Sequence, residues 1–266
     1  MIFDSSRRTV LLHALLFVLA AFIVQGCVPR TTVPIETVRY EGKTPEAHRV
    51  LLVFLPGNGD PVTVFEKKGL IKAVRDRGLQ ADIVAVYAHI GYYLNGSALT
   101  RIKEDVIDPA KARGYTQIWL IGDSLGGYGS ISYARTHPDD ITGIVLLGPF
   151  LGDKELINEI KQAGGLSAWD PGAVGNNSME DWNRHIWLWV KDCSKEKLCK
   201  DRTYMGYGLH DRFSFGQSLL GSSLPPEHAI AINGGHDWST WKKIWDQFLD
   251  RKIFSDPSVQ QFSVPK

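Results

Sequence analysis

The chain has 266 residues, of which 44% are hydrophobic and 22% charged, and its 30 Lys and Arg nearly balance its 29 Asp and Glu. Asp4, Arg7 and Arg8 together account for the formal net charge of +1, so the chain beyond residue 26 is formally neutral. This balance gives no indication of a nucleic acid or an anionic surface as a partner. The sequence shows no internal repeat.

The first 26 residues have the pattern of a secretion signal. Arg7 and Arg8 precede an apolar stretch over residues 10–24 that only His13 interrupts, and the small residue Gly26 suits a peptidase cleavage site. This stretch is too short for a comfortable transmembrane helix, which needs about 20 residues. We therefore expect a cleaved signal peptide over residues 1–26.

Cys27 ends the sequence Val-Gln-Gly-Cys, which resembles the bacterial lipobox. The resemblance implies that Cys27 is lipidated and becomes the new first residue, anchored in the cell envelope. The two or three acyl chains of a bacterial lipoprotein give lasting attachment, whereas a single chain binds a membrane only marginally. Val28 stands where an aspartate would signal inner-membrane retention, which implies the outer membrane, facing the periplasm. An uncleaved signal anchor and a plain signal peptide are the alternatives.

The rest of the chain is expected to form one domain. Removing residues 1–26 from the 266 leaves 240, a size typical of one α/β domain with a full core. Prolines and threonines over residues 27–48 are typical of a tether. Strands are expected over residues 49–55, 82–88, 117–121, 141–147, 202–208 and 228–232, and helices over 62–77, 98–113 and 238–248.

Short apolar runs between amphipathic helices indicate an α/β fold, a doubly wound, mostly parallel sheet covered on both faces. The domain is expected over residues 49–254, followed by a C-terminal tail over 255–266. The alternation breaks over residues 152–200, which predicts a helical, lid-like insertion at the carboxyl edge of the sheet. Its Trp182, Trp187 and Trp189 either pack the insertion onto the domain, as such residues usually do, or wall an acyl or aryl pocket.

Ser124 stands in Gly122-Asp123-Ser124-Leu125-Gly126, which fits the G-x-S-x-G pattern and follows a predicted strand. The glycines two before and two after the serine are needed because a side chain there would collide with the neighbouring strand and helix in so tight a turn. We therefore expect Ser124 to be a nucleophile on a sharp strand-to-helix turn.

A serine needs a base and a group that orients the base. His236 follows the last predicted strand, and Asp211 lies just beyond the strand before it, so both are expected near the sheet edge that carries Ser124. The order Ser, acid, His is that of the α/β-hydrolase fold. Asp153 and Asp237 are weaker candidates for the acid, and His210 and His89 are weaker candidates for the base.

A tetrahedral intermediate needs backbone N–H donors aimed at its oxyanion. Leu125, directly after the nucleophile, is expected to supply one donor, and Asn58 in the loop Leu55-Pro56-Gly57-Asn58-Gly59-Asp60 the other. This glycine-rich loop lacks the Lys-Ser/Thr of a P-loop and the G-x-G-x-x-G pattern, which argues against phosphate binding.

Cys193 and Cys199 close a short loop, and in an exported protein such a pair is expected to form a disulfide. Zinc is the alternative, but the spacing is not C-x-x-C and a second pair is missing from the sequence. No metal or cofactor is expected.

The stretches Gly122–Gly129 and Gly235–Trp241 carry a family resemblance. On these residues the chain resembles an α/β-hydrolase over about residues 49–250, and in particular the esterase D branch, which includes S-formylglutathione hydrolases, feruloyl esterases and mycolyltransferases. Asp123 departs from that branch, in which histidine commonly precedes the serine, and brings a negative charge near the site. The Leu55–Gly59 loop is shorter than the branch's usual oxyanion segment.

The expected function is that of a membrane-anchored serine hydrolase that cleaves a carboxylic ester of a small molecule or lipid through an acyl-enzyme. Acyl transfer by the same triad is one alternative. A non-catalytic binding lipoprotein on a hydrolase scaffold is another, and the complete set of triad candidates argues against it.

Overall fold

The computed structural model describes residues 28–42, 50–176, 178–193 and 197–255. The predicted signal peptide, Cys27, residues 43–48 of the predicted tether and residues 256–266 of the predicted tail lie outside the described residues. None of the helices in the described ranges combines the length and the apolar character that a bilayer-spanning helix needs.

A single sheet forms the centre of the described chain, with the strand order β1-β3-β2-β4-β5-β6-β7. Within the part of the sheet ordered β3-β2-β4-β5-β6-β7, each strand is parallel to its neighbours. The edge strand β1 pairs with β3 in the antiparallel direction. The predicted α/β fold class with a mostly parallel sheet is confirmed. The strands are β1 Thr37–Tyr40, β2 Val50–Leu55, β3 Asp82–Val86, β4 Gln117–Asp123, β5 Gly143–Leu147, β6 Thr203–Gly208 and β7 Ala229–Ile232.

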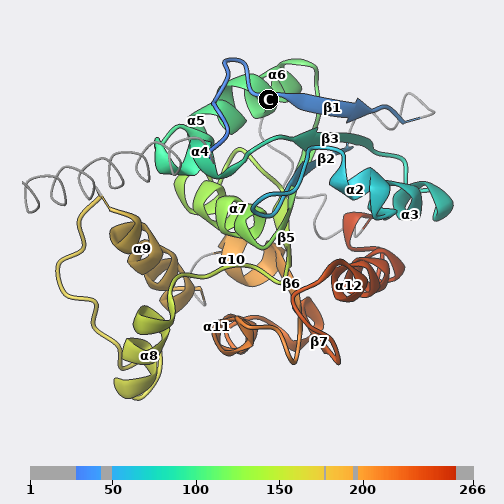
Figure 1. Ribbon diagram of the computed structural model, residues 1–266. Helices are drawn as coiled ribbons and strands as arrows, with labels where there is room; N and C mark the ends of the chain where they lie inside the picture. The colour runs from blue at the N-terminus through green and yellow to red at the C-terminus, as the bar shows by residue number, and fades with distance from the viewer. Residues whose placement is uncertain (1–27, 43–49, 177, 194–196, 256–266) are drawn as a thin grey trace, which may run out of the picture.

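Helices cover both faces of the sheet, as Figure 1 shows. Successive residues of a strand point to opposite faces, so in β2 Leu51 and Val53 join one buried cluster and Leu52 and Phe54 join the other. The second cluster is covered by α2 Val64–Lys67, α3 Leu70–Asp76 and α12 Trp238–Asp250. The first is covered by α4 Ile90–Leu94, α5 Ala98–Ile102, α6 Asp108–Ala112, α7 Leu125–Thr136, α8 Lys154–Gln162, α9 Met179–Lys191 and α11 Ser214–Gly221.

Two of the predicted helices are less regular than the sequence indicated. The helix expected over residues 62–77 is divided into α2 and α3 by Gly69, whose φ of 78° is left-handed. The helix expected over residues 98–113 contains a π-helical turn, η2 Lys103–Ile107, before α6. Pro109 lacks the N–H that an α-helix would use there, and the turn closes instead with the Asp108 N–H bonded to the Lys103 carbonyl.

The predicted tether is wrong for its described part. Residues 37–40 form β1, and Ile35, only 4% exposed, donates its backbone N–H to Asp105 at 2.8 Å. The backbone N–H of Thr32 bonds the Tyr92 hydroxyl of α4 at 2.9 Å. Residues 32–40 therefore lie on the domain and include an edge strand, where a solvated linker was expected.

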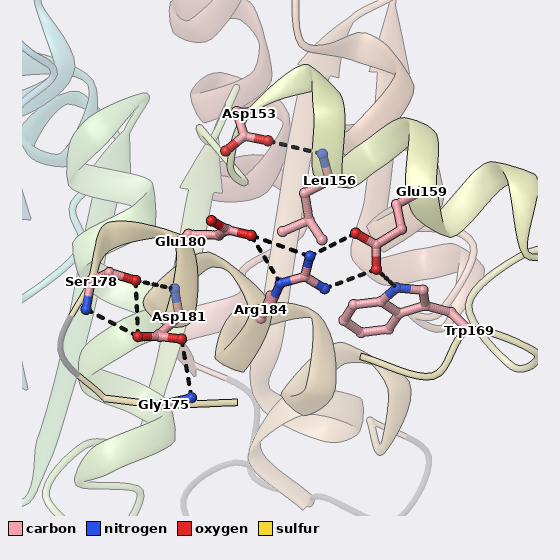
Figure 2. A network of polar contacts seen from close by, with 9 residues as sticks. All are labelled: Asp153, Leu156, Glu159, Trp169, Gly175, Ser178, Glu180, Asp181 and Arg184. Atoms are coloured by element: carbon pink, nitrogen blue, oxygen red, sulfur yellow. Dashed lines mark hydrogen bonds and ion pairs between the residues drawn. The ribbon is translucent and has the colours of Figure 1, made fainter. Parts of the chain in front are cut away.

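The predicted insertion contains α8 and α9, and an ion pair joins them. Arg184 of α9 makes two hydrogen bonds to the Glu159 carboxylate of α8, at 2.8 and 2.7 Å, and Glu159 also accepts from the Trp169 indole at 2.8 Å, as Figure 2 shows. Ser178 and Asp181 form a capping box at the start of α9. The ion pair fixes the two helices to each other, and the capping box stabilises the start of α9.

The tryptophans of the insertion mostly pack it onto the domain. Trp169 and Trp187 are fully buried, and the Trp187 indole donates to the Leu151 carbonyl at 2.8 Å. Trp189 is 8% exposed, and only Trp182 is half-buried. The packing interpretation is therefore the better one, because few of these rings are free to line a pocket.

The predicted disulfide is present between Cys193, just after α9, and Cys199 in α10 Lys197–Arg202. Replacing both residues by serine is expected to lower the free energy of unfolding by about 2 kcal/mol, because the unfolded chain regains the entropy of a short closed loop. Chemical denaturation measures this change. A reducing agent should shift the wild-type midpoint and leave that of the double variant in place; a wild-type midpoint that does not move would contradict the prediction.

Candidate active site

Ser124 lies on the sharp turn between β4 and α7. Its backbone angles, φ 46° and ψ −111°, are strained for a residue with a side chain. The turn is held from both sides: the Ser124 N–H donates to the Leu147 carbonyl of β5 at 3.2 Å, and the Ser124 carbonyl accepts from Phe150 at 2.9 Å. Strands and helix together impose the conformation that exposes the hydroxyl.

Gly122 and Gly126, which flank the nucleophile, are required because a side chain would not fit there, and not because their backbone angles favour glycine. A Cβ on Gly122 would overlap the backbone of Gly126, and a Cβ on Gly126 would overlap the Leu55 carbonyl of β2. Neither glycine has a left-handed φ. The turn can therefore pack this closely against β2 only because both positions lack a side chain.

Three side chains from separate loops meet at the carboxyl edge of the sheet. The Ser124 Oγ lies 3.0 Å from Nε2 of His236, and Nδ1 of His236 lies 2.7 Å from Oδ2 of Asp211. Ser124 follows β4, Asp211 follows β6 and His236 follows β7. The structure thus brings together the three residues predicted as nucleophile, orienting acid and base, in the expected hydrogen-bonded order.

Asp211 is held firmly in place. It is 3% exposed, and Oδ1 accepts the Phe213 backbone N–H at 2.8 Å while Oδ2 accepts the Gln217 amide at 3.2 Å as well as the His236 ring. Gln217 also donates to the Pro149 carbonyl at 3.1 Å. Sequence analysis missed Gln217, because α11 was not predicted and a single buried glutamine has no motif.

Two aromatic edges fix the plane of the His236 ring. Phe213 and Trp241 contact it in T-shaped geometry, with centroids 5.0 and 4.9 Å away. Phe213 in turn meets Phe150, and Trp241 meets Trp238, at 5.4 and 5.0 Å. Sequence analysis missed Phe213, which lies two residues after Asp211 in the same predicted loop.

Of the four weaker candidates for acid and base, three are helix caps and one is exposed. Asp153 and Asp237 cap α8 and α12, accepting the backbone N–H groups of Leu156 and Thr240 at 2.9 and 3.0 Å. His89 caps α4 through Nδ1. His210 is exposed, one position before Asp211.

The two segments predicted to form the oxyanion hole lie beside the nucleophile. Leu125 is the first residue of α7, where a backbone N–H has no carbonyl partner within the helix. Asn58 lies in a turn closed by the Asp60 N–H and the Gly57 carbonyl at 3.3 Å. A Cβ on Gly57 would be 3.4 Å from Cβ of Ser124, so this turn runs directly past the serine.

Asp123 lies directly before the nucleophile, where the sequence suggested a negative charge near the site. It is fully buried, and burial raises the pKa of its carboxyl well above the usual value; the nearby Asp60 raises this pKa further, while backbone N–H groups of Gly57 and Asp123 lower it. The folded protein therefore favours the neutral form of this carboxyl more than the sequence suggested.

Within the described residues, no group of three or more His, Cys, Asp and Glu side chains is arranged to hold a metal ion. The groups that converge at the carboxyl edge are a hydroxyl, an imidazole and a carboxylate. This set transfers a proton and forms a covalent bond to an acyl group.

Comparisons with known proteins agree with this geometry. The family model described as "Serine aminopeptidase, S33" matches residues 98–206, which include Ser124 and end before Asp211. No curated protein matches the chain.

Several solved structures share the fold. A ferulic acid esterase aligns with a TM-score of 0.57 and 16% identity, over 86% of this chain and 98% of its own. The S-formylglutathione hydrolase FrmB from Staphylococcus aureus aligns with 0.52 and 14%, over 85% and 99%. Est1E from Butyrivibrio proteoclasticus aligns with 0.52 and 16%, over 83% and 96%.

The likeness to these structures establishes the α/β-hydrolase fold, and the family match covers the turn that carries the nucleophile. With the hydrogen-bonded serine, histidine and aspartate at its carboxyl edge, the chain is a serine hydrolase of the α/β-hydrolase fold.

Replacing Gly126 by alanine is expected to reduce labelling of Ser124 by a fluorophosphonate at least about 100-fold, because the added methyl group pushes the turn away from β2. Gly221→Ala in α11 is the matched control: its new Cβ meets only the flexible end of Met205 at 3.1 Å, so labelling should be retained. Circular dichroism shows whether each variant is folded. Normal labelling of Gly126→Ala would contradict the packing argument.

Proposed function

We propose that this protein hydrolyses carboxylic esters through an acyl-enzyme on Ser124. The observation that carries the proposal is the continuous hydrogen-bonded chain from the Ser124 hydroxyl through both ring nitrogens of His236 to the Asp211 carboxylate. The carboxylate fixes Nδ1 as the protonated nitrogen, which leaves Nε2 free to accept the serine proton.

In the first half-reaction, Ser124 Oγ attacks the ester carbonyl carbon while His236 Nε2 takes the hydroxyl proton. The carbonyl oxygen becomes an oxyanion, which the backbone N–H groups of Leu125 and Asn58 stabilise at about 3 kcal/mol each. The intermediate collapses when His236 returns the proton to the leaving alcohol. Asp211, buried and held by Gln217, stabilises the imidazolium throughout.

In the second half-reaction, water replaces the alcohol. His236 takes a proton from the water as its oxygen attacks the acyl carbon, the same two N–H groups hold the second oxyanion, and the proton returns to Ser124 Oγ as the acid leaves. The enzyme is thereby restored with no cofactor consumed.

Aromatic rings next to the triad support an ester with an apolar or aromatic portion. Three half-buried rings surround the ring of His236: Phe213 contacts it directly, Phe150 contacts Phe213, and Trp238 contacts it through Trp241. The solved structures with this fold include proteins named ferulic acid esterase and S-formylglutathione hydrolase. These names support placing the chain in the esterase D branch.

Lipidation of Cys27 and an outer-membrane location remain part of the proposal. Val28 is next to the proposed lipid, and residues 32–35 already contact α4 and Asp105. A lipid on Cys27 would hold the domain close to the bilayer, without a spacer of the predicted length. Val33 and Leu94, 76% and 60% exposed, belong to this region and suit contact with a lipid surface.

Ser124→Ala is expected to lower kcat for p-nitrophenyl esters by about 10⁴ to 10⁶ and to abolish fluorophosphonate labelling, because the remaining site has no nucleophile. Asp211→Asn should lower kcat by about 10⁴, since the amide favours the wrong tautomer of His236. A panel from acetyl to palmitoyl esters, with aryl esters beside it, defines the acyl site. Wild-type protein that neither turns over these esters nor reacts with the probe would refute the proposal.

Cys27→Ser is expected to move the protein from the membrane fraction of a bacterial cell to the soluble periplasmic fraction and to remove incorporation of labelled palmitate, because the thioether and the acylated amine both form at Cys27. Membrane fractionation with Ser124→Ala as the control measures this. Persistence of the Cys27→Ser protein in the membrane with its palmitate label would count against the anchor.

A further inference from the structure

Two carboxyl groups flank Gly57, the residue before the proposed oxyanion donor. A Cβ on Gly57 would lie 2.5 Å from Oδ2 of Asp123 and 3.4 Å from Oδ2 of Asp60. Both carboxyls therefore crowd the same point of the turn, and the absent side chain of Gly57 is what gives them room. The same point is 3.4 Å from Cβ of Ser124.

Of these two carboxyls, Asp123 is the one whose surroundings favour the neutral acid more strongly. Asp123 is completely buried, and within the described chain neither of its carboxyl oxygens has a hydrogen-bond partner of good geometry. A bare carboxylate in that environment is far more costly than the neutral acid. The nearby Asp60 carboxylate also repels a negative charge on Asp123, which favours the neutral acid there.

Asp60 is the better place for the negative charge. It is half-buried, and burial raises its pKa on balance, although a hydrogen bond from Trp238 and the charge of Lys68 act in the opposite direction; the pKa of the fully buried Asp123 is raised well above the usual value. From the α4 side Tyr93 interacts with Asp123; it is a buried phenol whose pKa is raised mainly by burial, so it stays neutral. Trp238 and Lys68 thus support an anion at Asp60, whereas at Asp123 the backbone N–H groups lower the pKa by less than burial raises it.

We propose that Asp123 is a positioning residue for the oxyanion hole: as a neutral acid packed against Gly57, with Asp60 also close to this glycine, it supports the backbone that presents the Asn58 N–H. The role of Asn58 rests on the proposed esterase function. A neutral Asp123 leaves the developing oxyanion unopposed, whereas an ionised Asp123 would repel both Asp60 and the oxyanion.

Crowding at Gly57 provides a direct test. Gly57→Ala is expected to lower kcat about 100-fold with little change in KM, because the new methyl group displaces the turn from the Asp123 carboxyl and moves a donor that acts in the transition state. Asp123→Ala removes the obstructing oxygen, so Gly57→Ala/Asp123→Ala should recover to within about tenfold of Asp123→Ala alone. Additive losses in the double variant would overturn the proposal.

Asp123→Asn tests the charge state, because it keeps the shape and cannot ionise. It should retain more kcat than Asp123→Ala, and the alkaline decline in wild-type kcat that follows loss of the Asp123 proton should be absent. Identical alkaline profiles, or a folded Asp123→Asn no better than Asp123→Ala, would overturn the proposal.

Thermal unfolding supplies a readout that needs no catalysis. A group whose pKa is raised on folding loses its contribution to stability as the pH rises, so the Tm of wild type relative to Asp123→Asn should fall between pH 4 and neutral pH. A constant difference overturns the neutral acid even if the protein proves not to be an esterase. A falling difference in a protein without esterase activity would support the neutral acid while refuting the proposed function.

Discussion

The strained backbone at Ser124 is the constraint on which the rest of the site depends. A φ of 46° is unfavourable for serine by itself. It persists because the Ser124 N–H is bonded to β5 and because α7 packs closely against β2. The cost is met by packing of the sheet, where the central strands are fully buried. The exposed hydroxyl is therefore a property of the whole core and not of a flexible loop.

Around this turn, each catalytic side chain is held in position by a neighbouring residue. Gln217 and the Phe213 backbone hold Asp211, Asp211 holds one nitrogen of His236, and two aromatic edges hold the plane of its ring. Such preorganisation matters because the groups that stabilise a transition state need no rearrangement at the moment of reaction. On the other side of Ser124 the two carboxyls around Gly57 give the oxyanion segment a comparable support.

The sequence predicted the sheet well because buried parallel strands are short apolar runs. The predicted strands all exist, with shifted ends, and the turn at Ser124 follows from the requirement for glycine at positions 122 and 126. It failed for β1, a four-residue edge strand with no apolar run, and for the division of the first helix at Gly69. Ser124, Asp211 and His236 could be predicted to lie close together because each follows a parallel strand, and parallel strands have their carboxyl ends at the same edge of the sheet.

By itself the sequence determined the layered α/β arrangement, the nucleophile turn and the residue types available for catalysis, since these depend on local pattern and on the alternation of strands and helices. Only the tertiary structure decided which carboxylate orients His236, since Asp153 and Asp237 are used as helix caps, and which aromatics surround the ring. It also decided that Asp123 is buried against Asp60 and a glycine. Those outcomes depend on distances between segments far apart in the chain, and on the loss of water around a buried charge, neither of which a linear pattern encodes.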